Sequence, residues 1–386
     1  MNIKPFAVEE WMNAYEDGAR YNIAETCVDS VSLDELFALC SEDRQAFLEH
    51  FCARRLTYGD IVGSEALREG VCGLYQSLTP SEVVPTHGAA GANYHVFCSL
   101  VSPGDGVVSI MPAYQQMYSI PEAIGADVRL MHLRQENGYL PDLDSIPEEV
   151  LKKTKYMIVS YPLNPVCVCA PDEFYEKLIA FAKKNEIVIL HDNAYSDITY
   201  GDKPGKSFLS FEGAKDVGAE FYSLSKSYNL TGARISFVVG NKEIISKFRL
   251  LRSQIDYGIF YPVQYAAIAA LIGPDDFIEE QRRQYASRNK TLCGGLRRIG
   301  WDVRDSQGTM FVWAKIPEGY ASSVDFCMKL MERTGVIVTP GSAFGSNGEG
   351  YVRMALVVNE SVIEEIVDVL DASGIFKKNS IKESDI

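Results

Sequence analysis

One lysine stands between two serines in Ser223-Leu224-Ser225-Lys226, directly after an apolar run. The residues that follow are polar, and a second apolar run covers 235–239, so the pattern predicts a strand, a polar loop and another strand. A lysine amine can act as a nucleophile toward carbonyl groups. The competing interpretation is an exposed lysine in a surface turn.

Asp192 stands at the carboxyl end of the apolar stretch 187–190, which we predict to be a strand. Active sites of open α/β sheets lie at such strand ends, although an aspartate there could also cap a turn or helix. Small residues at 88–92 open a predicted helix that runs to about Val101. Such a turn suits an anion, because its N–H groups are free, but it also suits tight helix packing.

Strands and helices alternate between residues 80 and 240, which predicts a mostly parallel sheet covered on both faces. Further strands are expected at 127–133 and 156–160. A helix is expected at 171–185, with one buried face formed by Phe174, Leu178, Phe181 and Ala182.

The two ends of the chain carry helical patterns of their own. Trp11, Met12 and Tyr15 fit one helical face, and Ser32 with Glu35 forms a predicted capping box before the stripe Leu36, Phe37 and Cys40. A long charged helix is expected from about Asp275. Later, a strand is expected at 308–313, then a helix with the stripe Val324, Cys327, Met328 and Met331, and finally a frayed tail from Ile375 to Ile386.

Composition narrows the class of protein. The chain has 386 residues, 47% of them apolar, which is enough for a substantial core. The net charge of −15 argues against a nucleic-acid partner. We expect no membrane span, since no run of about 18 apolar residues occurs. The nine scattered cysteines predict a reducing, cytoplasmic location, and no metal-binding spacing is present.

Seven motifs in order resemble the class I and II aminotransferases, pyridoxal-phosphate (PLP) enzymes of fold type I. The resemblance covers about residues 55–370 and rests on Tyr58 to Arg68, the turn at 87–92 with its distance to 103–108, Asn164-Pro165, Asp192 with Tyr195, Lys226 with Ser223 and Arg234, 308–313, and 335–353. It implies a mostly parallel seven-stranded sheet between helices and a smaller α+β domain. The expected division is 1–45 as an N-terminal segment that joins the small domain and covers the active site, 46–275 as the large domain, and 276–386 as the small one.

The resemblance also implies roles around PLP. Lys226 would form the Schiff base, and Asp192 would pair with the pyridine nitrogen. Asn164 and Tyr195 would bind the phenolate oxygen, and Tyr114 would stack on the ring unless it is a surface tyrosine. The phosphate would be held by Ala89, Ala90, Ser223, Ser225 and Arg234.

Two further residues would serve the substrate and the assembly. Arg353 would bind the α-carboxylate of the substrate, unless it is a surface arginine in an ion pair, and Asn164 would also contact the substrate. Tyr58 would reach the phosphate in a neighbouring subunit, which implies a homodimer with shared active sites. Its competing interpretation is a tyrosine packed against a helix.

The implied activity is transfer of an amino group between an α-amino acid and a 2-oxo acid. The alternatives are a PLP lyase or cyclase acting at Cβ or Cγ, and more remotely a PLP-binding regulator without turnover. Two departures from the family pattern bear on this. Val166-Cys167 replaces the usual Thr-Gly, and Ala24 to Val28 replaces a Gly/Pro-rich stretch, which leaves the substrate open.

Overall fold

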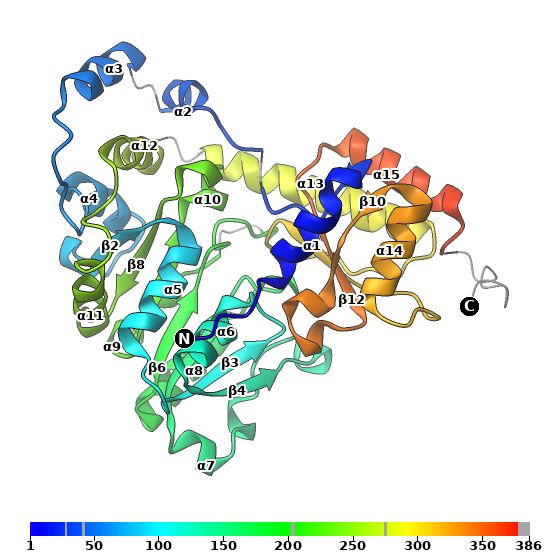
Figure 1. The fold of residues 1–386 in the computed structure, drawn as a ribbon, viewed down its shortest axis with the longest axis horizontal. Coiled ribbons are helices and arrows are strands. Elements are labelled where there is room, and N and C mark those ends of the chain that lie inside the picture. Colours follow the sequence, from blue (N-terminus) through cyan, green and yellow to red (C-terminus); the bar gives the residue numbers. More distant parts are fainter. Residues whose placement is uncertain (28, 41–42, 202–204, 274–275, 377–386) are drawn as a thin grey trace.

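A computed structural model describes residues 1–27, 29–40, 43–201, 205–273 and 276–376 (Figure 1). A seven-stranded sheet forms its centre, in the order β2 (Val83–Thr86), β8 (Ser236–Gly240), β7 (Gly218–Ser223), β6 (Val188–Asp192), β5 (Thr154–Ser160), β3 (Gly106–Met111) and β4 (Asp127–His132). Only β8 runs antiparallel to its neighbours. The predicted fold class is therefore confirmed.

Helices cover both faces of this sheet. Every residue of β3, β7 and β8 is buried, as expected for strands that are packed on both sides. The helices that join or flank the strands are α4 (Glu65–Cys72), α5 (Gly88–Leu100), α6 (Gln116–Ile124), α7 (Glu148–Leu151), α8 (Asp172–Asn185), α9 (Ala214–Val217), α10 (Leu224–Ser227), α11 (Lys242–Arg252) and α12 (Tyr261–Ile272). In α8, Phe174, Leu178 and Ala182 are buried as predicted, because they share one helical face.

The C-terminal part is built on a second, antiparallel sheet in the order β11 (Thr339–Pro340), β12 (Tyr351–Ala355) and β9 (Phe311–Lys315). It also contains α13 (Asp276–Arg298), α14 (Ser323–Thr334) and α15 (Glu360–Ser373). The stripe predicted for α14 is wrong by about one residue. Val324 is 41% exposed, whereas Cys327 is buried as predicted, and Phe326 and Leu330 are buried outside the predicted stripe.

An aromatic cluster explains that shift. Phe326 lies 5.5 Å from Trp301 between ring centroids, and Trp301 stacks on Phe376 at 4.6 Å with an interplanar angle of 16°. Ile375 and Phe376 are each only 9% exposed, so the predicted fraying is wrong for these two residues. The rest of the predicted tail, 377–386, lies outside the described residues.

The N-terminal segment packs mainly on the C-terminal part. Helix α1 (Ala7–Tyr15) buries Trp11 and Met12, and the Trp11 Nε1 donates to the Val338 carbonyl at 3.0 Å. Strand β1 (Tyr21–Asn22) pairs in parallel with β10 (Val336–Ile337). Helices α2 (Leu33–Leu39) and α3 (Arg44–Ala53) follow, at the upper left of Figure 1.

The predicted capping box at Ser32 is confirmed, since Glu35 bonds back to the Ser32 backbone. The domain boundary expected at residue 45 stays a prediction. The one expected at residue 275 lies outside the described residues. Across the part of the chain that the structure describes, no helix is both long and apolar enough to cross a membrane.

Candidate active site

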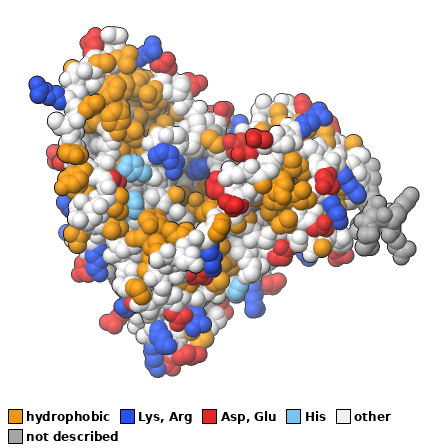
Figure 2. Space-filling model, in the orientation of Figure 1, with side chains coloured by type: hydrophobic (Ala, Val, Ile, Leu, Met, Phe, Trp, Pro, Cys, Tyr) orange, Lys and Arg blue, Asp and Glu red, His pale blue; other side chains and the backbone are white. Residues whose placement is uncertain are grey.

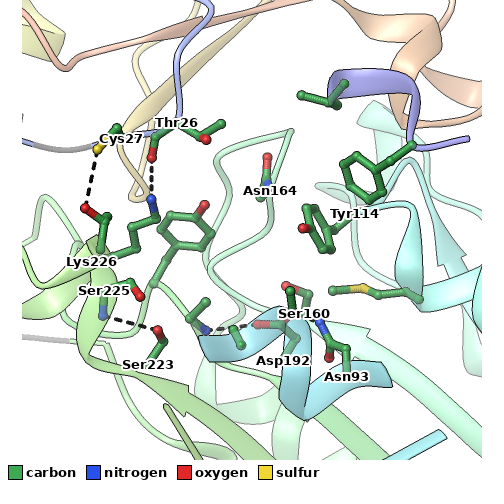
Figure 3. A pocket seen from close by; sticks show the side chains of 18 of the residues that line it. Thr26, Cys27, Asn93, Tyr114, Ser160, Asn164, Asp192, Ser223, Ser225 and Lys226 are labelled. Carbon is green, nitrogen blue, oxygen red and sulfur yellow. Dashed lines mark hydrogen bonds between the residues drawn. The ribbon is translucent and has the colours of Figure 1, made fainter. Parts of the chain in front are cut away.

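A cavity of about 320 Å³ opens where three adjacent parallel strands end (Figure 3). Ser160, Asp192 and Ser223 are the last residues of β5, β6 and β7, and all three line it. The carboxyl edge of a parallel sheet is the usual position of such sites. The structure brings together here the predicted residues Ala89, Ala90, Tyr114, Asn164, Asp192, Tyr195, Ser223, Ser225, Lys226, Arg234 and Arg353.

Lys226 lies on a single helical turn, α10, and not in the polar loop expected from the sequence. The Ser223 hydroxyl caps this turn by accepting from the Ser225 N–H at 3.2 Å, which satisfies a donor that a loop would leave free. The Lys226 Nζ donates to the Thr26 carbonyl. Burial, reinforced by the positive charges of Arg353 and Arg234, lowers the pKa of Lys226 to about 8. A substantial share of this amine is therefore neutral near physiological pH.

Asp192 is a buried carboxylate with two donors. Its oxygens accept from the Asn93 amide at 3.2 Å and from the Ala194 N–H at 3.1 Å. Burial raises the pKa of Asp192, although these two bonds oppose the shift. Asn93 is a site residue that the sequence reasoning missed. A signal was available, because Asn93 lies one helical turn after Ala89 on the same face of α5.

A second buried carboxylate lies behind Asp192, on the neighbouring strand. Glu220 accepts from the Tyr75 hydroxyl at 2.8 Å and the His191 Nδ1 at 3.1 Å, and from Asn193 at 2.8 Å. Burial alone would raise the pKa of Glu220, but these bonds outweigh it and leave that pKa below its usual value. The two residues that flank Asp192 are thus both held by one carboxylate.

Arg353 is buried, with 1% of its surface exposed, so the surface-arginine interpretation is wrong. Its guanidinium lies 4.0 Å from the Phe311 ring centroid and 4.6 Å from that of Phe344. The Nη1 donates to the Asn164 Oδ1 at 2.9 Å, whereas Nε and Nη2 have no hydrogen-bond partner among the described residues. Burial lowers its pKa to about 10. A buried cation with two free donors in one plane is suited to a carboxylate.

The start of α5 and Arg234 form an anion cradle. The His87 side chain does not cap the helix, so its first N–H groups are left for another acceptor. Gly88 has φ +75°, and a Cβ there would lie 2.2 Å from the Arg234 Nη2. Glycine therefore allows the guanidinium to come close to the helix start, beside Ala89 and Ala90.

Two tyrosines form part of the cavity wall. Tyr114 lines it, which contradicts the surface-tyrosine interpretation, and burial raises its pKa to about 12. Its ring lies 5.0 Å from that of Phe6. Tyr195 is buried, and its ring packs edge-on against Phe311 at 5.8 Å.

The loop after β5 keeps its turn despite its departure from the family pattern. Cys167 has φ +66°, the region that favours glycine, at the position where the family has glycine. Its N–H donates to the Leu163 carbonyl at 2.6 Å, which closes the turn around Asn164. The loop therefore places Asn164 in the cavity without the usual Thr-Gly pair.

The N-terminal segment supplies cavity-wall residues that the sequence reasoning did not name individually. We call residues 5–9 and 24–27 the roof; its members in the cavity wall are Phe6, Val8, Glu9, Thr26 and Cys27. The Gln115 side-chain amide holds the roof by two hydrogen bonds. The Ala7 N–H donates to its Oε1 at 2.8 Å, and its Nε2 donates to the Pro5 carbonyl at 2.7 Å. These contacts join residues more than 100 positions apart, so no local pattern predicts them.

Tyr58 alone among the predicted site residues lies outside the cavity. It is 88% exposed, and its ring lies 5.3 Å from that of Tyr257 beside a separate hollow of about 450 Å³. A position in a neighbouring subunit's site stays a prediction.

The aminotransferase class I and II family matches residues 32–370 of this chain. The chain belongs to this family. An LL-diaminopimelate aminotransferase from Halothermothrix orenii is 42% identical over 294 residues, which are 76% of this chain and 75% of that protein. One from Nitratidesulfovibrio vulgaris (Miyazaki F) is 40% identical over 318 residues, covering 80% and 82%.

Solved structures agree. A PLP-dependent aminotransferase from Streptococcus suis has a TM-score of 0.89 at 30% identity, covering 98% of this chain and all of that one. Substrate-bound BacF from Bacillus subtilis has a TM-score of 0.86 at 32% identity, covering 96% and 98%. The protein is a fold type I aminotransferase that uses PLP, so the predicted family, activity and cofactor are confirmed, and the lyase or cyclase alternative is not favoured.

The residues of the cavity fit PLP chemically. The uncapped start of α5 and Arg234 offer donors to a phosphate. Asp192 is a buried carboxylate that lacks a cationic partner on its own oxygens, as a protonated ring nitrogen requires. Lys226 offers an amine that is partly neutral.

Proposed function

We propose that this aminotransferase moves the amino group between an α-amino acid and a 2-oxo acid in the cavity at the ends of β5, β6 and β7. The observation that carries the proposal is the convergence of three groups there: the Lys226 amine, the buried Asp192 carboxylate and the buried Arg353 guanidinium with two free donors. PLP, when bound, supplies the electron sink for the electrons left at Cα when its proton departs.

The residues divide between cofactor and substrate. Lys226 is the covalent attachment point of PLP, and Asp192 keeps a proton at the ring nitrogen. Asn164 and Tyr195 bind the phenolate oxygen, Tyr114 stacks on the ring, and the phosphate is held by Ala89, Ala90, Ser223, Ser225 and Arg234. The pocket position and charge of each residue support its role.

Lys226 also moves the proton at Cα. Its lowered pKa supports this role, because a neutral amine can accept a proton near neutral pH. Arg353 binds the α-carboxylate through its two free donors, which fixes the direction of the Cα–H bond relative to the Lys226 amine.

The test is a transamination assay on the purified enzyme. Amino acids, LL-diaminopimelate among them because relatives carry its name, are each paired with pyruvate and with 2-oxoglutarate, and the new oxo acid is measured. Lys226→Ala should remove turnover. Borohydride reduction followed by peptide mapping should place the pyridoxyl label on Lys226. A label on another lysine, or ammonia release without need of an oxo acid, would contradict the proposal.

We further propose a homodimer in which Tyr58 enters the partner's site. Support comes from exposed apolar side chains near it: Leu56 at 78%, Tyr257 at 58% and Phe260 at 55%. Figure 2 shows apolar side chains gathered at the upper left, the region of α3 and α12 in Figure 1. A monomeric chain rarely exposes a large apolar patch.

Subunit mixing tests the shared site. Tyr58→Ala and Lys226→Ala subunits, each inactive or nearly so alone, should give hybrid dimers with one intact site and therefore recover activity. If mass spectrometry demonstrates that subunits have exchanged but no activity is recovered, Tyr58 does not reach the active site of the partner subunit.

The cytoplasm is the compartment we propose. Nine cysteines lie in the described residues, and no disulfide joins any of them. Thiols persist in a reducing compartment.

A further inference from the structure

We infer that Glu9 selects amino donors whose side chain ends in a cationic group, such as an ω-amine or a guanidinium. This inference rests on the proposed function, because it concerns the side chain of the substrate in the same cavity. It deepens that function by naming a substrate class.

The cationic side chains of the cavity wall are the first observation that supports this inference. Three cations line it within the described part of the chain: Lys226, Arg234 and Arg353. Each has a role in the proposed function, at the amine, the phosphate and the α-carboxylate. Within one subunit, the described wall therefore holds no further cation for a second carboxylate, and that subunit offers no partner to the distal charge of a dicarboxylic donor.

Two carboxylates line the same cavity, and only one of them is engaged. Asp192 accepts two hydrogen bonds at the end of β6. Glu9 lies in the first turn of α1 and forms no ion pair with any described residue. Its negative charge nevertheless acts on the cavity, because it raises the pKa of both Tyr114 and Arg353, against the stronger lowering that burial imposes on Arg353.

The roof holds Glu9 in place. Gln115 binds the backbone on both sides of Phe6, at Pro5 and Ala7, so the first turn of α1 is fixed over the cavity. The floor is closed by buried strand ends, so the open side of the cavity for the side chain of a donor bound through Lys226 and Arg353 is toward the roof. The apolar side chains of Phe6 and Val8 then face an aliphatic stem, and Glu9 lies beside them for the charged end.

A second acid adds to this field. Glu25, also in the roof, raises the pKa of Lys226 against the larger effect of burial. The roof therefore carries two acidic side chains, Glu9 and Glu25, and acidic groups beside a binding site favour cationic ligands over anionic ones.

The test compares L-arginine with L-citrulline as donors, because the two have nearly the same shape and differ in charge. kcat/KM is measured for wild type, Glu9→Gln and Glu10→Gln with a common oxo acid. Glu10 is the matched control: it lies in the same helical turn and is exposed, but it does not line the cavity. Loss of a helix-dipole contact therefore affects both variants alike.

We expect wild type to favour arginine over citrulline about fivefold, the scale of a partly solvated ion pair. Glu9→Gln should bring the ratio close to one, and Glu10→Gln should keep it. Raising the ionic strength should shrink the wild-type ratio only. An equal ratio in wild type and Glu9→Gln, in an enzyme that transaminates other amino acids, would overturn the inference alone. No transamination of any amino acid would overturn the proposed function, and this inference with it.

Discussion

The floor and the roof of the cavity are held in different ways. The floor consists of the strand ends Ser160, Asp192 and Ser223, which are 2%, 6% and 1% exposed. The roof includes the exposed Glu9 and Cys27, and it reaches the seven-stranded part through Gln115 at one end and through the contacts of Thr26 with Lys226 and of Cys27 with Thr231 at the other. In Figure 1 the N-terminal segment runs from beside that sheet to the C-terminal part.

This difference separates chemistry from selectivity. Buried groups with several partners cannot move without leaving donors or acceptors unpaired, so the floor keeps the reacting groups aligned. The roof is held over the cavity by fewer bonds than the floor, so displacing it costs less than displacing the floor, and substrate can enter and leave on this side. Substitutions in the floor should therefore change turnover, whereas substitutions in the roof should change substrate affinity.

Among substitutions that leave Lys226 in place, Asp192→Asn should have the largest effect on turnover. The substitution keeps the shape but removes the charge that holds a proton at the ring nitrogen, so we expect kcat to fall about 10³-fold. PLP should still bind, because the phosphate donors at α5 and Arg234 remain. Absorbance of bound PLP with steady-state kinetics checks both parts. Turnover near that of wild type would show that the floor does not set the chemistry.

Lys226 should react with acylating reagents at lower pH than an ordinary lysine. Burial disfavours the charged form and lowers its pKa from 10.5 to about 8, so the neutral share at pH 7 is about 300-fold larger than for a lysine with an unshifted pKa. Labelling of the apoprotein by acetic anhydride, read by mass spectrometry, should rise with pH, reach half of its maximum near pH 8 and level off above about pH 9. A lysine-containing peptide serves as the reference. A rise that continues to pH 10 would contradict the shift.

Arg353→Lys should lower kcat/KM for α-amino acids about 10²-fold, because an ammonium group cannot make two parallel bonds to a carboxylate. PLP binding should not change. Amines that lack a carboxylate, to the extent that they react, should lose much less, and this contrast is the control. An equal loss for both kinds of donor would mean that Arg353 supports the fold of the cavity and does not bind substrate.

Gln115→Ala should have the smallest effect, and this effect should be on substrate affinity. The substitution removes both hydrogen bonds to the roof, worth about 1 kcal/mol each, so KM should rise about fivefold or more while kcat changes less. Gln116→Ala, which leaves those bonds intact, is the matched control. A fall in kcat with unchanged KM would remove the distinction between floor and roof.

The floor could be predicted because its signals are local. Lys226 with Ser223 and Arg234, and Asp192 with Tyr195, are short strings at predicted strand ends, and the structure gathers them into one cavity. The helical turn at Lys226 was missed because four residues carry too little periodicity to reveal it.

A covering role was expected for the N-terminal segment, but the individual residues of the roof could not be predicted, since their position depends on contacts distant in sequence. Gln115 binds Pro5 and Ala7 across more than 100 residues, and neither end has a distinctive pattern. The error in α14 has the same cause. Phe326 points inward because it packs against the aromatic cluster of Trp301 and Phe376. Phe376 belongs to a stretch whose polar composition suggests a frayed end.

Trp11 lies in helix α1 two residues beyond the roof, so its fluorescence can report a movement of the roof. The chain has three tryptophans, Trp11, Trp301 and Trp313, and each lies in α1 or in the C-terminal part, outside the seven-stranded sheet. Trp11 is 7% exposed and its indole is bonded to Val338, so lifting of the roof would bring it into water and shift its emission to the red. With Trp301 and Trp313 replaced by phenylalanine, the emission of Trp11 would report opening and closing of the cover during turnover, without any attached dye.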